Sequence, residues 1–404
     1  MRNNALSLML VCLFIILAVQ LGYFAVHTFQ ILNVSTNERQ TMTISDAVEL
    51  LPFQACESSA KAMCLIEQNS GRVLYGKNIH KKLPMASTTK IFTALTVLEN
   101  CQDLDEVFEI DSRAVGVEGT SIYLKKGEKM SARELLYGMM LPSGNDAATA
   151  LAYRIGGNIE KFCELMQTTA KNAGSRNSSF KNPHGLDEAG HYTTAYDLAI
   201  TSSKALKNEI FKEIVGAKYQ TISGNEEVDK RYLKNKNKLL NLFEGATGVK
   251  TGFTDNAGRC YVSSASRENL DVVCCVLNCQ PMFEECKNFM EKAFKEYKNY
   301  ELLPEYNIVD TVGVEKGKQD EVKIYSQKKF VFPLTTEEFL KINYEYEKPD
   351  VLNAPIKKEE CVGKVKIYLE NQILFEDDLI TTDEISSNSL IQGIKDIIFR
   401  WKKQ

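Results

Sequence analysis

Residues 83–90 have the sequence Leu-Pro-Met-Ala-Ser-Thr-Thr-Lys, and from Ser87 to about Glu99 the apolar residues follow helical spacing. The apolar positions are Ile91, Ala94, Leu95 and Leu98. This pattern predicts an amphipathic helix with Ser87 and Lys90 on one face of its first turn. A desolvated, neutral lysine can accept the proton of a serine hydroxyl, and free N–H groups at a helix N-terminus can stabilise a developing oxyanion. The segment therefore indicates a candidate serine nucleophile with a lysine base.

A serine three residues before a lysine is weak evidence alone, because the pattern also starts at Ser58, Ser178 and Ser326. Only the pattern at Ser87 begins a strongly amphipathic helix. A second polar element, residues 143–145 (Ser-Gly-Asn), lies between two apolar helical patterns. The first of these opens with a capping box at residues 131–134 and ends before Pro142. A polar tripeptide between two buried helices is well placed to face a cleft.

A third element, Lys250-Thr251-Gly252, occurs once and lies in a strand pattern. A glycine at this point would let another backbone segment approach closely. The order S-x-x-K, S-x-N, K-T-G, each in a suitable structural context, resembles the penicillin-recognising serine enzymes. The chain is most similar to the low-molecular-mass penicillin-binding proteins that act as D-alanyl-D-alanine carboxypeptidases. Residues 182–187, 190–198 and 248–254 are also typical of that family.

The resemblance implies a reaction on the D-alanyl-D-alanine end of peptidoglycan stem peptides. Ser87 would form an acyl-serine with release of the terminal D-alanine, and Lys90 would be the base. Ser143 would relay a proton to the leaving amine, and Asn145 would position Lys90 and the substrate amide. The resemblance requires no metal ion and no organic cofactor, and it implies that β-lactam antibiotics act as inhibitors.

The resemblance also assigns substrate-binding roles along the K-T-G strand. Lys250 and Thr251 would bind the terminal carboxylate, Gly252 would allow the close approach, and the substrate backbone would add alongside the strand. The oxyanion hole would consist of the backbone N–H groups of Ser87 and Phe253. In this family Lys250 also lies close enough to Lys90 to lower its pKa by like-charge repulsion.

The fold class expected is a mixed α/β penicillin-binding/β-lactamase-like transpeptidase domain with an antiparallel sheet and helices, then a small all-β domain and a C-terminal amphipathic helix. Strand patterns at both ends of the first domain, with helices between them, predict that the two ends share one sheet. The expected divisions are a signal peptide or signal-anchor at 1–29, a linker at 30–59, the catalytic domain at 60–300, the β-rich domain at 301–386 and the amphipathic helix at 387–404.

The two ends of the chain predict export and membrane attachment. Residues 5–29 contain no charged side chain and follow Arg2, which is the charge order of a secretory signal or signal-anchor. Residues 390–404 are amphipathic and basic and contain the single Trp, which suits the surface of an anionic membrane. The alternatives are a buried N-terminal helix and a C-terminal helix docked on its own domain. We expect an exported protein attached to the outer face of the bacterial cytoplasmic membrane.

Composition narrows the function classes further. The 404 residues include 53 acidic and 49 basic side chains, a net charge of −4, so no basic excess indicates a nucleic-acid partner. With four histidines in the whole chain, the composition does not indicate a His-rich metal centre. Eleven cysteines are unusual for an exported chain, and we therefore expect a reducing host environment, such as an anaerobic one.

Competing interpretations of the sequence remain at this stage. A Ser-His-Asp arrangement could involve His184 or His191 with Asp187 or Asp197, but the lysine already supplies a base. A β-lactamase would share the main motifs, yet no E-x-x-L-N pattern lies between the second and third motifs. Transpeptidation remains open because water and an amine compete for the same acyl-enzyme. A non-catalytic, membrane-tethered protein that binds cell wall or β-lactams is the alternative from another class.

Overall fold

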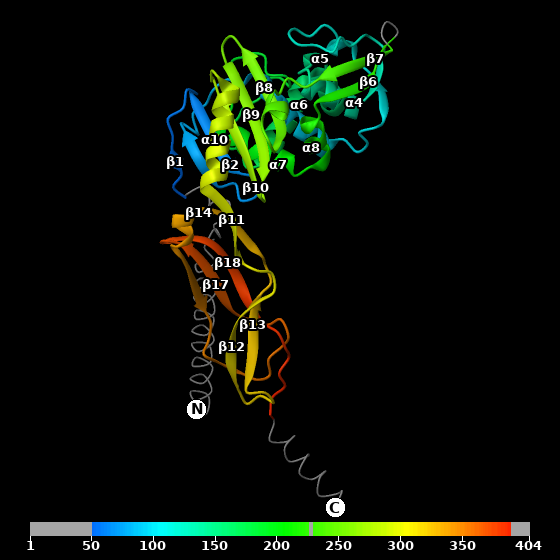
Figure 1. The fold of residues 1–404 in the computed structure, drawn as a ribbon. Coiled ribbons are helices and arrows are strands. Elements are labelled where there is room, and N and C mark those ends of the chain that lie inside the picture. Colours follow the sequence, from blue (N-terminus) through cyan, green and yellow to red (C-terminus); the bar gives the residue numbers. More distant parts are fainter. Residues whose placement is uncertain (1–50, 226–228, 389–404) are drawn as a thin grey trace, which may run out of the picture. The chain divides into compact units, whose positions relative to one another are not determined.

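The computed structural model describes residues 51–225 and 229–388, and the fold is given for these residues (Figure 1). The first domain is built on a sheet with the strand order β1-β3-β2-β10-β9-β8. Its strands are β1 (Gln54–Ala55), β2 (Ala62–Glu67), β3 (Val73–Lys77), β8 (Ala246–Thr254), β9 (Gly258–Arg267) and β10 (Leu270–Leu277). All neighbouring pairs are antiparallel except β1 and β3. Strands from the two ends of the domain therefore share one sheet, as predicted, and β8 forms one edge.

Helices and two small hairpins fill the chain between β3 and β8. The helices are η1 (Ala86–Thr88), α3 (Thr89–Asn100), η2 (Ser112–Ala114), α4 (Ala132–Met140), α5 (Asn145–Gly156), α6 (Ile159–Asn172), α7 (Ala195–Leu206), α8 (Glu209–Gly216) and α9 (Leu239–Leu242), and α10 (Met282–Glu296) follows the sheet. The hairpins pair β4 (Val107–Glu109) with β5 (Lys129–Ser131), and β6 (Tyr219–Ser223) with β7 (Lys230–Lys234). The predicted capping box at Ser131 and Glu134 opens α4.

The sheet is buried on both faces at its centre, where β2 and β10 are apolar at nearly every position. In β2, Met63 and Leu65 join the cluster that includes α10, whereas Cys64 and Ile66 join the cluster formed with α3 to α8. This separation follows from the two-residue alternation of side chains along a strand. Figure 1 shows α10 (yellow) lying across β9 and β10 on one face of the sheet. The sheet and its helices therefore form a rigid support for residues at the edge strand β8.

The second domain consists almost entirely of strands and has its own apolar core. Its sheet has the order β15-β17-β18-β13-β12-β16, and a separate pair joins β11 and β14. The elements are β11 (Tyr297–Leu303), β12 (Asn307–Glu315), β13 (Glu321–Ser326), β14 (Phe330–Thr335), α11 (Thr336–Phe339), β15 (Ile342–Glu347), β16 (Val351–Asn353), β17 (Cys361–Leu369) and β18 (Gln372–Thr381). Phe330 stacks on Phe375 in this core, with ring centroids 4.4 Å apart. The expected mixed α/β domain followed by an all-β domain is confirmed.

Two differences from the expected divisions have clear physical reasons. Gln54 and Ala55, placed in a linker from sequence, form strand β1 and pair with Tyr75 and Gly76. A two-residue strand is too short to show the alternation that marks a strand. Strand β11 crosses the expected boundary at residue 300, because its pairing with β14 begins at Tyr297. The predicted leader at 1–29 and the amphipathic helix at 390–404 lie outside the described residues.

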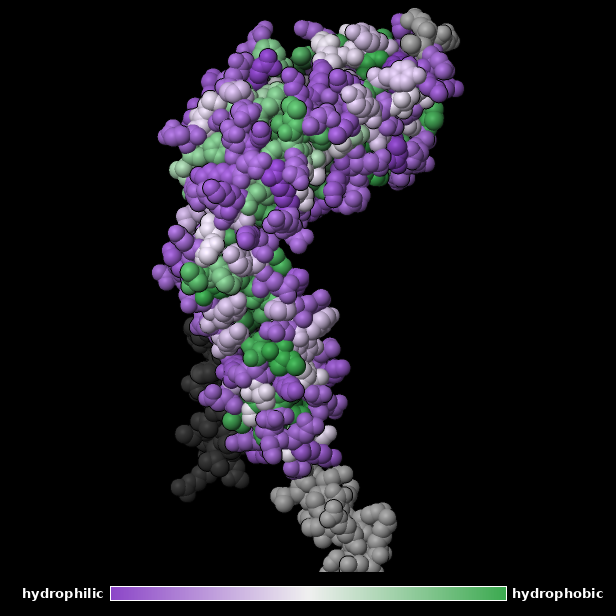
Figure 2. Space-filling view, in the orientation of Figure 1, coloured by the Kyte–Doolittle hydropathy of each residue, from purple (hydrophilic) through white to green (hydrophobic). Residues whose placement is uncertain are grey.

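The surface and the thiols complete the description of the chain. Figure 2 shows that the visible face is mostly hydrophilic, with hydrophobic residues in small separate areas.

Between residues 51 and 388 every cysteine is a free thiol, and Cys361 is the exposed one. Burial raises the pKa of the Cys163 thiol to about 11, which keeps it protonated at neutral pH. Within the described ranges, no helix has the length and apolar character needed to cross a membrane.

Candidate active site

Ser87 lies in the 3-10 turn η1, directly before helix α3. The sequence predicted one helix from Ser87, whereas the structure has this tight turn first and the α-helix from Thr89. The preceding residue, Ala86, has a φ of 49°, a conformation that costs free energy for a residue with a side chain. Lys90, in the first turn of α3, places its Nζ 3.0 Å from Ser87 Oγ. The three-residue spacing therefore brings the two side chains together.

Lys90 is fully buried and has three oxygen partners. Its Nζ lies 2.7 Å from Asn145 Oδ1, 2.8 Å from the His184 carbonyl oxygen and 3.0 Å from Ser87 Oγ. A neutral amine has two N–H donors and one lone pair. With its two N–H groups donated to Asn145 and His184, the lone pair faces the Ser87 hydroxyl. This geometry fits a base that accepts the serine proton.

The electrostatic environment favours the neutral form of Lys90. Burial lowers its pKa well below the ordinary value, and the charges of Lys250 and Lys236 lower it further, while Asp146 acts in the opposite direction. Lys250 is also buried, and burial together with Lys236 lowers its pKa to about 7. The like-charge effect of Lys250 on Lys90 was expected from sequence, but the contribution of Lys236 was not. Lys236 lies in a polar loop whose pattern gave no sign of this role.

The S-x-N element connects helices α4 and α5 and turns one side chain toward Lys90. Asn145, at the start of α5, accepts from Lys90 and donates its Nδ2 to the Glu118 carbonyl oxygen at 2.7 Å. Its backbone N–H donates to Thr120 at 2.6 Å. Ser143 has a φ of 74°, and its buried Oγ has no hydrogen-bond partner among the described residues. A buried hydroxyl without a partner is costly, and it is available to a substrate group.

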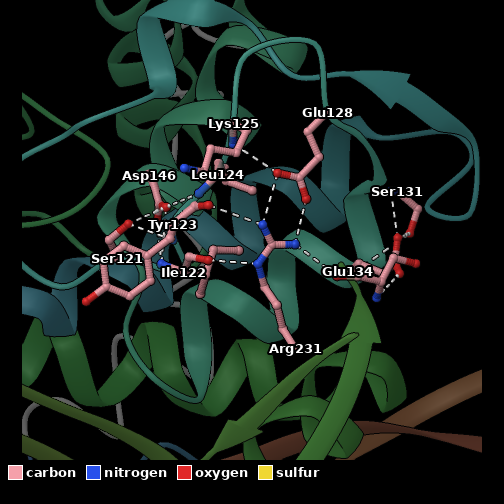
Figure 3. Close-up of polar contacts among 11 residues, drawn as sticks. Ser121, Ile122, Tyr123, Leu124, Lys125, Glu128, Ser131, Glu134, Asp146 and Arg231 are labelled. Carbon is pink, nitrogen blue, oxygen red and sulfur yellow. Dashed lines mark hydrogen bonds and ion pairs between the residues drawn. The ribbon is translucent and has the colours of Figure 1, made fainter. Parts of the chain in front are cut away.

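Asp146, the residue after Asn145, belongs to a second polar cluster that fixes residues 121–124 (Figure 3). Asp146 is buried, and its carboxylate accepts from Ser121 Oγ at 2.6 Å and from the backbone N–H groups of Ile122 and Leu124 at 3.1 Å. Three donors around one carboxylate satisfy a buried charge. The same residue pair, Asn145 and Asp146, thus connects the base to the backbone of residues 118–124.

Arg231 holds this segment from the other side. Its guanidinium forms a buried ion pair with Glu128 and donates to the Ile122 carbonyl oxygen at 2.8 Å and to that of Tyr123 at 3.2 Å. Figure 3 shows Arg231 pointing between Glu128 and the Ile122–Tyr123 backbone. The two charged residues are 103 positions apart in the chain. Sequence reasoning missed Asp146, Glu128 and Arg231, because no local pattern links residues so far apart.

The K-T-G element lies on the edge strand β8, next to the turn that carries Ser87. A Cβ atom added to Gly252 would come within 2.9 Å of the Ser87 backbone nitrogen. Only glycine fits there without displacing the nucleophile. Thr251, Gly252 and Phe253 line a cleft of about 1020 Å³ together with Ser87 and Ser143. Lys250 is buried beneath this surface, with Nζ 3.2 Å from the Thr251 carbonyl oxygen.

The two histidines near the site have structural contacts. His191 Nε2 lies 2.9 Å from Thr89 Oγ1, and its Nδ1 accepts from the Lys181 backbone N–H at 3.0 Å. Burial lowers the pKa of His184 to about 3 and that of His191 to about 4, so both are neutral. In the described part of the chain neither ring is hydrogen-bonded to Ser87. The Ser-His-Asp alternative therefore lacks its central contact.

A serine beside a buried lysine, on a mixed α/β domain with an edge strand next to the nucleophile, is the arrangement of a serine hydrolase with a lysine base. Comparisons with known proteins agree. A family described as D-alanyl-D-alanine carboxypeptidase matches residues 49–281, and one described as penicillin-binding protein 5, C-terminal domain, matches residues 297–387. The chain therefore belongs to the D-alanyl-D-alanine carboxypeptidase family, the serine carboxypeptidases of the penicillin-binding class.

Individual relatives cover between 60% and 85% of this chain. The D-alanyl-D-alanine carboxypeptidase DacF of Bacillus subtilis is 32% identical over 85% of this chain and 90% of its own length. The structure of penicillin-binding protein 5 from Haemophilus influenzae is 25% identical, with a TM-score of 0.69 over 84% of this chain and 100% of that chain. The Streptomyces K15 DD-transpeptidase is 31% identical, with a TM-score of 0.56 over 60% of this chain and 99% of that chain. The family expected from sequence is confirmed, and the β-lactamase and non-catalytic alternatives are not favoured.

Proposed function

We propose that this protein removes the terminal D-alanine from peptidoglycan stem peptides through an acyl-Ser87 intermediate. The observation that carries the proposal is the fully buried Lys90 amine, 3.0 Å from the Ser87 hydroxyl, in surroundings that lower its pKa. A neutral lysine in contact with a serine is a base ready to activate that serine. The family and the two-domain organisation support the same reaction.

In the acylation step, Ser87 Oγ attacks the carbonyl carbon of the penultimate D-alanine and its proton passes to Lys90. The negative oxygen that forms would be stabilised by the backbone N–H groups of Ser87 and Phe253. The bond between this carbon and the nitrogen of the terminal D-alanine then breaks. Ser143, whose Oγ has no other described partner, would relay the proton to the leaving amine. The products are free D-alanine and an ester on Ser87.

In the deacylation step, water attacks the ester carbon and gives its proton to Lys90. The bond between the carbonyl carbon and Ser87 Oγ breaks, and Ser87 regains a proton. Asn145 would hold Lys90 in place during both steps, since its Oδ1 is 2.7 Å from Nζ. A D-amino acid amine could take the place of water, and the likeness to the Streptomyces K15 DD-transpeptidase makes this the second candidate reaction.

Recognition of the substrate would depend on its terminal carboxylate. Lys250 and Thr251 are assigned to bind this group, since a cation beside a hydroxyl suits an anion. Binding the carboxylate would in turn favour the charged form of Lys250, whose pKa is about 7 in the free protein. We assign the segments at 1–29 and 387–404 to export and to attachment at the outer face of the cytoplasmic membrane. β-Lactams would acylate Ser87 in the same way as the substrate.

The test is the mass of the full-length protein, purified in detergent, after incubation with benzylpenicillin. The expected result is one added penicilloyl group, located on the peptide that contains Ser87, together with release of D-alanine from a diacetyl-L-Lys-D-Ala-D-Ala peptide. The variant Ser87→Ala should show neither. Rapid turnover of penicillin without an adduct would instead indicate a β-lactamase, and absence of both adduct and turnover would contradict the proposal.

A further inference from the structure

A second depression adjoins the cleft that contains Ser87. It has a volume of about 490 Å³ and lies between residues 121–125 and strand β7. Pro142 and Tyr232 line both the cleft and the depression, so the two are continuous. A volume of this size is within the range of small-molecule sites. The acylation and deacylation steps use none of the residues that line the depression.

Two exposed tyrosine rings line this depression. Tyr123, on the 121–125 segment, is 77% exposed, and Tyr232, on β7, is 82% exposed. Side chains this exposed contribute little to the core. A tyrosine ring combines a broad apolar face with a polar hydroxyl, and tyrosine is for this reason common at binding surfaces. The two rings thus offer apolar faces to a ligand beside the cleft.

The backbone of Tyr123 is held in an unfavourable conformation. Its φ of 62° is rare for a bulky residue and costs free energy. Its N–H donates to Ser121 Oγ at 2.8 Å, and its carbonyl oxygen accepts from Arg231 at 3.2 Å (Figure 3). The carboxylate of Asp146 accepts from the backbone N–H groups on either side of Tyr123. Buried polar groups therefore fix the position of an exposed ring, which is typical of a ligand-binding position.

The depression also carries positive charge. Lys125 and Lys230 line it, and Arg231 in its wall is paired with Glu128. None of the described residues that line the depression is Asp or Glu. A surface of one sign attracts ligands of the opposite charge. The ligand that fits this depression therefore has ring-sized apolar faces and belongs to an acidic molecule.

A sugar polymer that carries acidic peptides has both properties. The C–H groups on one face of a pyranose ring pack on an aromatic ring, while its hydroxyl groups remain in water. A lipid surface would instead require large apolar side chains on a protruding face. The inference rests on the proposed function, because the stem peptides that react at Ser87 are attached to such a polymer. The polymer extends in both directions from each stem, so its strand can cross the depression while one stem occupies the cleft.

We propose that Tyr123 and Tyr232 form a carbohydrate-binding subsite for the sugar backbone of the cell-wall polymer. The two rings stack on sugar rings of the strand, and Lys125 and Lys230 attract the carboxylates of neighbouring stem peptides. The subsite raises the affinity for stem peptides that are attached to the polymer. A free peptide occupies the cleft alone and does not benefit from these contacts.

The experiment measures D-alanine release by the full-length protein from two substrates. One is uncrosslinked polymeric peptidoglycan with intact pentapeptide stems, and the other is diacetyl-L-Lys-D-Ala-D-Ala. In Tyr123→Asn/Tyr232→Thr, the ratio of kcat/KM for the polymer to that for the peptide should fall by roughly tenfold, the effect of truncating aromatic contact residues. Asn tolerates a left-handed backbone and Thr favours a strand, so both replacements suit their positions. The affinity for glycan strands without stems, measured by calorimetry, should fall by a similar factor.

The matched control is Tyr306→Asn. Tyr306 is also a tyrosine with a left-handed backbone, with a φ of 54° and 63% exposure, and it belongs to the second domain. Its substitution should leave both the ratio and the glycan affinity unchanged. A ratio that survives the double substitution would overturn the subsite, and so would stem-free strands that fail to bind the unmodified protein.

Two further outcomes separate this inference from its alternatives. Weaker attachment of the double variant to phosphatidylglycerol vesicles, with glycan binding unaltered, would overturn the subsite in favour of a membrane contact. Failure of the unmodified protein to release D-alanine from either substrate would instead count against the proposed function. Binding of stem-free strands does not depend on Ser87, so the two failures are distinguishable.

Discussion

Asn145 and Asp146 are neighbours in the chain, yet they belong to two regions with opposite characters. Asn145 contacts the buried amine of Lys90, in a region where Ser143 Oγ lacks a described partner and two lysines have lowered pKa values. Asp146 belongs to the region around Arg231, where the carboxylate and the guanidinium are each surrounded by hydrogen-bond partners. We call these the reactive cluster and the supporting cluster.

Burial alone does not separate the two clusters, because the polar groups of both are almost completely buried. The two clusters differ in how completely their charges are paired and their hydrogen bonds are formed. A paired buried group stabilises one conformation, whereas an unpaired or pKa-shifted one costs free energy and persists where function requires it. Substitutions in the reactive cluster should therefore affect activity first, and those in the supporting cluster should affect stability first.

The largest effect is expected for Lys90→Met. The variant lacks the base while keeping an unbranched side chain of similar size, so D-alanine release should fall by about 10²- to 10⁴-fold, the contribution of a general base. The measurement is kcat/KM for the diacetyl tripeptide, together with the second-order rate of acylation by benzylpenicillin. Activity within tenfold of the unmodified protein would mean that another group is the base.

The second-largest effect is expected for Arg231→Met, and it is an effect on stability. This change leaves the buried Glu128 carboxylate without its cation and should lower the free energy of unfolding by about 3–5 kcal/mol. Urea denaturation measures it. The double variant with Glu128→Met should recover part of the loss, because no buried charge then remains unpaired. If Arg231→Met were as stable as the unmodified protein, the supporting cluster would not be the region that determines stability.

Ser143→Ala should separate activity from stability in the reactive cluster. Removing a buried hydroxyl that has no described partner should leave the free energy of unfolding unchanged or raise it by about 1 kcal/mol. D-alanine release should nevertheless fall by roughly 10²-fold if the hydroxyl relays a proton. The two measurements are urea denaturation and kcat/KM. A loss of stability without a loss of activity would move Ser143 into the supporting cluster.

The smallest effect is expected in the pH profile of Lys236→Met. Only neutral Lys90 can accept a proton, so kcat/KM rises with pH through the pKa of Lys90. The charge of Lys236 lowers that pKa, and its removal should shift the acid limb to higher pH. The control is Lys234→Met, which removes a lysine from the same cleft. A limb that moves equally in both variants would show that the effect is not specific to Lys236.

Local patterns in the sequence predicted much of the reactive cluster's composition. Ser87 and Lys90 follow helical spacing, and Gly252 was recognised as a position for close backbone approach. These features depend on residues near one another in the chain. The family, the shared sheet and the all-β second domain were predicted in the same way, from motifs and from alternation.

The supporting cluster could not be predicted because its contacts are long-range. Arg231 stood in a lysine-rich polar segment, and Glu128 followed a glycine in a charged loop. Nothing in either neighbourhood indicates that the two form a buried pair. Lys236 was missed for a related reason, since its effect on Lys90 arises from a loop that returns to the cleft.

The position of β8 at the edge of the sheet has a consequence for association between molecules. An unpaired strand edge usually invites pairing with the edge of another protein, which leads to aggregation. Here the nucleophile turn packs over the face of β8 and β9, so close that Gly252 has no room for a side chain. The turn therefore leaves the backbone edge of β8 free for pairing while it holds Ser87 beside that edge. The edge that could invite association with another sheet is thus also the edge along which a peptide would reach the nucleophile.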